Sequence, residues 1–297
     1  MVGVRPRMGL ASPRAVHALL RAGTQRLESA GIVPARHEAE WLLSHLLDVA
    51  PLELYLDERE APVPVVERFF ARIEARAMGC PLQYLIGAAE FFGERLVVNP
   101  GVFIPRPETE AIVQAALEAL RPRRRQLARP LRLLDLGTGS GCIAIALARA
   151  LPACLVVGVE VSWVALRTAR RNVRRSGLAS QVHLVQSDWG LAIRGRFDGV
   201  ISNPPYVPRA RVEQLPLDVR QEPRESLDGG EDGMAALTVL LDEGARLVSP
   251  GGVVVLECGE EHVELLARRA ADAAWVRAVW PIDDLAARPR GVLLYAR

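Results

Sequence analysis

Four consecutive residues, Asn203, Pro204, Pro205 and Tyr206, combine hydrogen-bond acceptors with an aromatic ring at the end of an apolar run. The asparagine offers a side-chain carbonyl, and proline lacks an N–H, so a stiff backbone can present its own carbonyl acceptors. Two acceptors in fixed positions suit an NH2 group, and a tyrosine ring can stack on a flat amide or base. A proline-rich turn after a strand is the alternative, because Asn-Pro also marks ordinary turns. The chemistry favours binding of a planar nitrogen.

Three segments upstream of this tetrapeptide also follow predicted strands. Residues 131–136 form a short buried strand by their apolar pattern, and a glycine turn over 137–141 separates it from a helix predicted over 142–150. Glycines let a cofactor approach the backbone, and the N–H groups at a helix start favour a carboxylate or phosphate. Glu160 ends the next strand, roughly 20 residues beyond the glycines, where such folds place an acid on ribose hydroxyls.

The third strand, over 181–186, is followed by Asp188 and Trp189, an acceptor and a ring that could contact an adenine. Taken singly, the glycine turn could be structural, Glu160 could be a solvated strand end, and the tryptophan could be core. The carboxyl ends of successive parallel strands, however, meet at the edge of an open α/β sheet where ligands bind. We therefore expect these segments to form one ligand site.

Together the four segments resemble a class I S-adenosylmethionine-dependent methyltransferase that acts on an amide or exocyclic nitrogen. The resemblance implies an α/β fold with a Rossmann-like, mostly parallel seven-stranded sheet, S-adenosyl-L-methionine as the cofactor and no metal. The implied catalytic residues are Asn203, Pro204, Pro205 and Tyr206. The implied cofactor-binding residues are Gly137, Thr138, Gly139, Ser140, Gly141, Glu160, Asp188, Trp189 and Asn203.

More narrowly, the chain resembles the peptide chain release factor N5-glutamine methyltransferases. The resemblance rests on P-L-Q-Y-L-I-G (81–87), E-F-F-G (90–93) and I-P-R-P-E-T-E (104–110), and continues through 221–223, 232–234 and 251–252. It implies methyl transfer to the glutamine side-chain amide in the Gly-Gly-Gln motif of class I release factors, the expected partners. Two other interpretations stay open: an N-methyltransferase for exocyclic amines of DNA or RNA bases, and a cofactor-binding module without catalysis.

The chain departs from the family pattern at two places. Family members usually have aspartate where Glu160 stands, a change that keeps the charge and lengthens the arm. Near the C-terminus, residues 284–290 resemble the family element D-L-x-G-x-x-R, but Ala287 replaces the glycine and Pro289 stiffens the loop. We expect the first change to preserve ribose binding and the second to affect the path of the loop.

The composition limits which cellular compartment and which classes of partner can be expected. The formal net charge of +2 lacks the basic excess typical of nucleic-acid binding. The four cysteines are scattered, without a C-x-x-C pair or a histidine at metal-ligand spacing, as in a reduced protein without a metal site. No apolar run follows Arg5 and Arg7 as in a secretion signal, and none is long enough to span a membrane. We expect a cytoplasmic monomer with no stable nucleic-acid partner and no membrane contact.

Apolar residues at helical spacing predict a small helical bundle before residue 80. We expect a helical substrate-recognition domain over 1–80, a β-hairpin linker over 81–105 and the methyltransferase domain over 106–297. The alternative is that the bundle only stabilises the rest of the chain and does not bind the substrate.

One conspicuous charge run lies between the expected linker and the first strand of the sheet. A helix is predicted from Pro107 to Leu120, and the arginine-rich run Arg121 to Arg129 follows it. We expect a solvated connection broken by Pro122. Contact with RNA phosphates is the alternative, because clustered arginines attract them.

Overall fold

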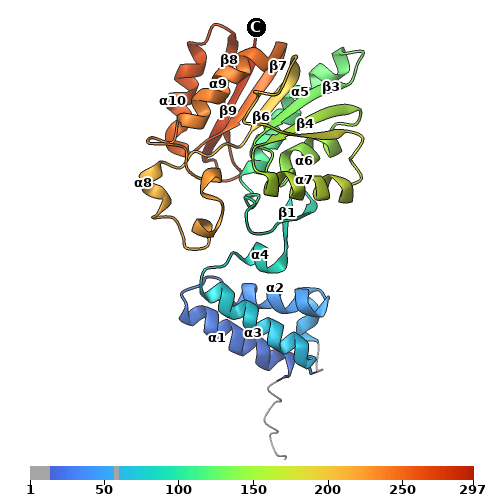
Figure 1. Cartoon of the computed structure of the whole chain (residues 1–297), viewed down its shortest axis with the longest axis vertical. Helices are drawn as coiled ribbons and strands as arrows, with labels where there is room; N and C mark the ends of the chain where they lie inside the picture. The colour runs from blue at the N-terminus through green and yellow to red at the C-terminus, as the bar shows by residue number, and fades with distance from the viewer. Residues whose placement is uncertain (1–13, 57–59) are drawn as a thin grey trace, which may run out of the picture. The chain divides into compact units, whose positions relative to one another are not determined.

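The structure is a computed structural model that describes residues 14–56 and 60–297, and it divides into two compact units (Figure 1). The first unit extends to Ile86 and the second runs from Gly87 to Arg297. This division falls inside the segment 81–105 that we expected to act as a linker. Arg5 and Arg7 lie outside the described residues.

Helices make up the first unit, and the predicted helical bundle is confirmed. The principal helices of its described residues are α1 (Val16–Ser29), α2 (Ala35–Leu47) and α3 (Val63–Ala77), with the short elements η1 (Pro51–Tyr55) and α4 (Leu82–Ile86). Phe69 and Ile73 lie four residues apart on α3 and are fully buried against the other helices. Gly23 on α1 permits this packing, because a Cβ atom there would lie 2.6 Å from Cζ of Phe69.

A seven-stranded sheet forms the centre of the second unit, with the strand order β5-β4-β3-β6-β7-β9-β8. Its strands are β3 (Leu131–Leu136), β4 (Cys154–Glu160), β5 (Val182–Gln186), β6 (Phe197–Ser202), β7 (Val248–Glu257), β8 (Val276–Asp283) and β9 (Pro289–Ala296). The strands from β3 to β7 run parallel, and β9 is antiparallel to both of its neighbours. The predicted mostly parallel seven-stranded sheet of a class I methyltransferase is therefore confirmed.

Helices cover both faces of this sheet (Figure 1). One face carries α5 (Thr109–Gln126), α6 (Cys142–Ala150) and α7 (Trp163–Arg175), and the other carries α9 (Ala235–Leu247) and α10 (Glu260–Ala271). Side chains alternate across a strand, so Leu133 packs into the first of these two cores and Leu134 into the second. Burial on both faces explains the continuous apolar runs that identified the strands.

The strand order reverses between β3 and β6, which makes their carboxyl ends the topological switch point of the sheet. The glycine turn follows β3, and Asn203 follows β6. The hydroxyl of Ser202 donates a 2.6 Å hydrogen bond to the carbonyl of Leu136 and ties the two strand ends together. The two main motifs are adjacent for this topological reason, although 62 intervening positions separate Ser140 from Asn203 in the numbering.

A small hairpin precedes the sheet and packs on it. Its strands are β1 (Ala88–Phe91) and β2 (Glu94–Val97). Asn172 of α7 bonds to both backbone groups of Val97 and donates to the carbonyl of Ser140 in the glycine turn. The hairpin is therefore attached to the segment that supports the glycine turn.

The arginine-rich run differs from our expectation. Helix α5 does not end at Leu120 but continues through Pro122 to Gln126. Arg123 and Arg129 both bind the fully buried carboxylate of Asp198, at 3.0 and 2.7 Å. The predicted proline-broken connection is therefore wrong over residues 121–126, because anchoring of Arg123 holds the helix beyond the proline.

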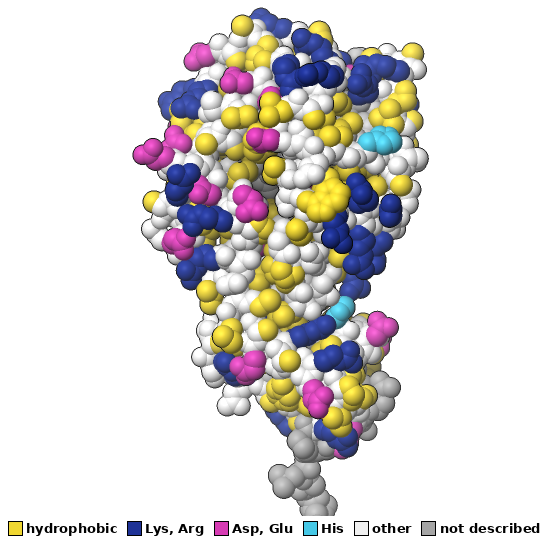
Figure 2. Space-filling view, viewed as in Figure 1, with side chains coloured by type: hydrophobic (Ala, Val, Ile, Leu, Met, Phe, Trp, Pro, Cys, Tyr) yellow, Lys and Arg dark blue, Asp and Glu magenta, His cyan; other side chains and the backbone are white. Residues whose placement is uncertain are grey.

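Arginines that the sequence did not single out gather on the exposed face of α7 (Figure 2). They are Arg167, Arg170, Arg171, Arg174 and Arg175. The opposite face of the helix is apolar and packs on the sheet. The helical spacing of these apolar residues therefore leaves the arginines on the solvent-exposed face. Within the described part of the chain, none of the helices has the length and apolarity needed to cross a bilayer.

Candidate active site

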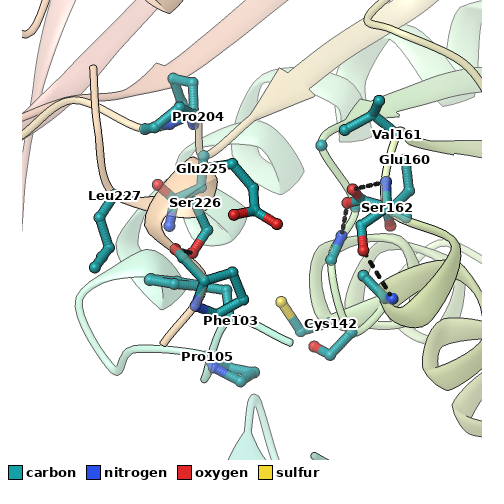
Figure 3. Close-up of a pocket in the computed structure, with 18 of the residues that line it drawn as sticks. Phe103, Pro105, Cys142, Glu160, Val161, Ser162, Pro204, Glu225, Ser226 and Leu227 are labelled. Atoms are coloured by element: carbon teal, nitrogen blue, oxygen red, sulfur yellow. Dashed lines mark hydrogen bonds between the residues drawn. The ribbon is translucent and has the colours of Figure 1, made fainter. Parts of the chain in front are cut away.

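A cavity of about 320 Å³ opens at the switch point of the sheet, entirely within the second unit. Figure 3 shows Glu160 and Ser162 on one side of it, Pro204 and the segment from Glu225 to Leu227 on the other, and Phe103 and Cys142 between them. Its size lies within the range of small-molecule sites. All of the expected site residues except Gly141 line this cavity.

The glycine turn has the backbone that its sequence requires. Gly137, Gly139 and Gly141 have φ angles of +74°, +56° and +84°, which side chains disfavour. Beneath the turn, Asp135 accepts hydrogen bonds from the Thr138 hydroxyl at 2.5 Å and from the Ala144 N–H at 3.1 Å. Burial raises the pKa of Asp135 to about 7 against the opposing effect of these hydrogen bonds. Gly141 lies behind the turn, where a Cβ atom would meet Ala169 at 3.3 Å.

Glu160 lies across the cavity rim from the tetrapeptide and joins two backbone segments. Its carboxylate accepts the Gly139 N–H at 2.8 Å and the Ser162 N–H at 2.9 Å (Figure 3). Burial raises the pKa of Glu160, and these backbone donors oppose the rise. The Val161 N–H also acts on this carboxylate. A carboxylate has about four lone-pair positions, so Glu160 keeps acceptor capacity for a hydroxyl group on the cavity side.

Asp188 and Trp189 line the same cavity beyond β5. Trp189 has a φ of +41°, and its ring lies 3.5 Å from where a Cβ on Gly137 would be. The ring therefore lies beside the glycine turn, in a position to cover a flat ligand. Asp188 is exposed at the rim.

Asn203 is oriented by Thr109, a member of the motif over 104–110 for which the sequence indicated no role of its own. Its Nδ2 donates a 2.9 Å hydrogen bond to Oγ1 of Thr109, a residue that is 1% exposed at the start of α5. The Asn203 side-chain carbonyl is thereby left for the cavity that both residues line. Buried Pro204 follows directly, and no N–H of the described loops and turns bonds to its carbonyl.

Two motifs quoted from opposite halves of the chain meet beside the cavity. Arg106 pairs with Glu222, whose second oxygen accepts the Ile104 N–H at 2.9 Å. The Arg106 guanidinium lies 5.0 Å from the ring centroid of Phe103, which lines the cavity. No spacing rule connects these segments, so only the family resemblance could have indicated that they act together.

The C-terminal loop follows a defined path despite its two substitutions. Asp284 accepts the N–H groups of Ala286 and Arg288 and binds Nε of Arg290 at 2.8 Å. Ala287 adopts a φ of +57°, the conformation that the glycine of the family element would favour. Burial raises the pKa of Tyr206, and the Arg290 charge, which the loop places nearby, opposes this rise.

The residues present fit S-adenosylmethionine. Ser140 is 2% exposed and lines the cavity, and its hydroxyl has no hydrogen-bond partner of good geometry among the described residues. Cys142 and Ile143 also line the cavity, and N–H groups in the first turn of α6 have no intrahelical partner. These donors suit a carboxylate, and the remaining acceptor capacity of Glu160 suits ribose hydroxyls.

Fold and site together define a class I S-adenosylmethionine-dependent methyltransferase. The PrmC N-terminal domain family matches residues 18–87, and the methyltransferase small domain family matches residues 95–219. The hMettl16 catalytic domain in complex with MAT2A 3′UTR hairpin 6 has a TM-score of 0.56 at 15% identity, covering 80% of this chain and 84% of that one. This likeness shows the fold alone.

Two release factor glutamine methyltransferases are similar to this chain over almost its whole length. The release factor glutamine methyltransferase of Moorella thermoacetica is 40% identical over 281 residues, 94% of this chain and 97% of that protein. That of Deinococcus radiodurans is 37% identical over 275 residues, 92% of this chain and 96% of that protein. The chain belongs to the release factor glutamine methyltransferase family.

Proposed function

We propose that this protein transfers a methyl group from S-adenosyl-L-methionine to the side-chain amide nitrogen of the glutamine in the Gly-Gly-Gln motif of class I release factors. The names of the relatives support this substrate. The observation that carries the chemistry is the bond from Asn203 to Thr109, because it orients the asparagine carbonyl as an acceptor beside the cavity.

The reaction demands orientation more than activation. An amide nitrogen is a poor nucleophile because its lone pair is delocalised into the carbonyl. The Asn203 side-chain carbonyl and the Pro204 backbone carbonyl accept its two N–H bonds and aim the nitrogen at the electrophile. The bound cofactor supplies a sulfonium methyl group as that electrophile. Positioning of this kind can lower a barrier by roughly 7–11 kcal/mol.

The same two acceptors act on charge as well as geometry. Positive charge develops on the nitrogen as the N–C bond forms and the methyl–sulfur bond breaks, and carbonyl dipoles held on its N–H groups stabilise that charge. The thioether leaves as the neutral product, and the methylated nitrogen, a strong acid while it is protonated, loses one of its two protons to solvent. The ring of Tyr206 stacks on the amide plane, and Pro205 sets the turn that brings the ring there. Glu160 binds the ribose hydroxyls, residues 137–141 contact the methionine portion and the ribose, and Asp188 with Trp189 frames the adenine.

The first unit is the module that recognises the release factor in this proposal. Its support is the match of residues 18–87 to the N-terminal domain of this family. The domain scheme is the one expected from sequence, with recognition over 1–80, a linker over 81–105 and catalysis over 106–297. The protein acts as a monomer in the cytoplasm, where release factors work, and needs no stable nucleic-acid partner.

Mass spectrometry of a class I release factor incubated with this protein and S-adenosylmethionine tests the substrate. One added methyl group on the glutamine of the tip, absent from a glutamine-to-alanine tip, is the expected result. An exocyclic base amine would also suit the two acceptors of Asn203 and Pro204. Methylation of RNA or DNA oligonucleotides, with none on the release factor, would therefore overturn the proposal.

A further inference from the structure

A buried carboxyl group without an assigned role lies next to the N-P-P-Y turn. Glu257 is the last residue of β7, and only 1% of its surface is exposed. Ser202 of β6 pairs in register with Leu256, so Asn203 and Glu257 each lie one residue beyond that pair. The neighbouring strand thus ends in an acid at the level where the tetrapeptide begins.

Hydroxyl groups from two different elements face this carboxyl. The Tyr206 hydroxyl donates to Oε1 of Glu257 at 3.3 Å. The Thr109 hydroxyl acts on the same carboxyl and lowers its pKa, while its oxygen accepts the 2.9 Å bond from Asn203. A hydroxyl has one proton, so acceptance from Asn203 leaves the Thr109 proton available for Glu257. Glu257 is therefore linked to Tyr206 directly and to Asn203 through Thr109.

The environment of Glu257 makes its charge state responsive near neutral pH. Oε2 has no hydrogen-bond partner of good geometry among the described residues. Burial raises the pKa of Glu257 to about 7, against the opposing effects of Thr109, Tyr206 and Arg290. The other charged or titratable groups that interact with it are Glu108, Cys142 and Cys258. The pKa of each cysteine is raised to about 12 by burial, so both stay neutral in the working range.

We propose that Glu257 is a positioning residue that, as a carboxylate, holds Asn203 and Tyr206 in the orientation needed for methyl transfer. The proposal rests on the proposed function. A carboxylate only accepts hydrogen bonds, so both hydroxyls must point at it, and the Thr109 lone pairs then face Asn203. A protonated Glu257 would instead donate its own proton to one of these hydroxyls. That hydroxyl would no longer donate to Glu257, and the part of the tetrapeptide that it holds would lose its fixed orientation. Turnover therefore rises with pH as Glu257 ionises.

Glu257→Gln tests this role, because glutamine keeps the shape and cannot ionise. We expect kcat on the release factor to fall at least about tenfold at the alkaline plateau, with the cofactor Kd within about twofold of the wild-type value. The low-pH limb of the kcat profile should disappear in this variant and persist in Glu257→Asp. Glu264→Gln is the matched control, because that acid lies exposed on α10 with 82% of its side chain accessible. Wild-type kcat and an unchanged limb in Glu257→Gln would overturn the proposal.

A second measurement needs neither substrate nor turnover. The ionisation of Glu257 can be followed by carbon NMR of its labelled carboxyl group in the full chain, and compared with Tyr206→Phe and Thr109→Val. Each variant removes a donor that stabilises the carboxylate, so each should raise the pKa of Glu257. Unchanged pKa values in both variants would contradict the arrangement. If these shifts occur while the wild-type protein leaves the release factor unmethylated, the substrate assignment fails and the link from Glu257 to the turn stands.

Discussion

Arg106 and Glu222 form an ion pair although 116 positions separate them in the chain. The glutamate side chain is 1% exposed, and it also accepts the Ile104 N–H at 2.9 Å. One buried carboxylate thereby fixes both the backbone and the guanidinium that flank Phe103. The cavity wall thus depends on two segments that are contiguous only in the fold.

Glu222→Ala should destabilise the protein by about 3 kcal/mol, because it leaves a partly buried guanidinium and a backbone N–H without their acceptor. The KM for the release factor should rise as Phe103 loses its support. Urea unfolding and initial rates measure the two effects. Glu213→Ala is the control, since that acid is 67% exposed in its pair with Arg224 and should change stability by less than about 0.5 kcal/mol. Equal effects in the two variants would contradict this role.

Glu160→Ala should weaken S-adenosylmethionine binding at least about tenfold by loss of the ribose acceptor. The kcat at saturating cofactor should change little, since Glu160 lies across the cavity from Asn203. Calorimetry gives the affinity directly. Glu160→Asp keeps a carboxylate, on the shorter side chain that family members usually have at this position. This variant should bind S-adenosylmethionine nearly as tightly as the wild-type protein. An unchanged affinity in the alanine variant would remove Glu160 from the cofactor site.

Asp135 should make folding stability fall as pH rises. Its folded pKa of about 7 lies above the ordinary value of 3.8, so the unfolded chain ionises first. Stability is then lost as pH increases from about 4 to about 7, by about 2–3 kcal/mol between pH 5 and pH 8 for this group. Asp135→Asn removes the titration, so the stability difference between variant and wild type should shift by that amount in urea unfolding. A difference independent of pH would contradict the burial effect.

Ala287→Gly should stabilise the C-terminal loop by about 0.5–1 kcal/mol. The φ of +57° at Ala287 costs an ordinary residue about 1–2 kcal/mol, and the larger unfolded entropy of glycine offsets part of the gain. Ala286→Gly at the adjacent exposed position raises the entropy of the unfolded chain in the same way but relieves no backbone strain, so it should destabilise the protein. Chemical unfolding of the two variants side by side gives the sign, and a destabilised Ala287→Gly would contradict the strain.

Much of the sheet was predictable because its strands are short apolar runs bounded by turn residues. The strand over 131–136 and the helix over 142–150 end where the sequence placed them, since the glycine turn separates two distinct periodicities. Helix α5 was predicted too short, because anchoring of Arg123 by Asp198 depends on a residue far along the chain. Local rules on proline carry no information about such a partner.

The site was predictable only where chemistry is concentrated at strand ends. Asn203 and Glu160 could be identified because their side chains follow apolar runs at the ligand edge. The contacts of Thr109, although it lies in the quoted motif over 104–110, and of Glu257 could not be predicted, because a threonine at a helix start and an acid at the end of a long strand have ordinary structural explanations. In the fold, the hydrogen bond from Asn203 reveals the contact of Thr109 with the tetrapeptide, and the register of β6 against β7 places Glu257 beside it.

The role of Asn203 is tested most directly by the single-turnover rate of methyl transfer to the release factor in Asn203→Ala, measured together with its S-adenosylmethionine affinity. The rate should fall by more than about a hundredfold while the cofactor Kd stays within about twofold, because the lost carbonyl orients the substrate amide and the other expected cofactor-binding residues stay in place. A cofactor affinity that collapses together with the rate would contradict the assignment of Asn203 to the substrate.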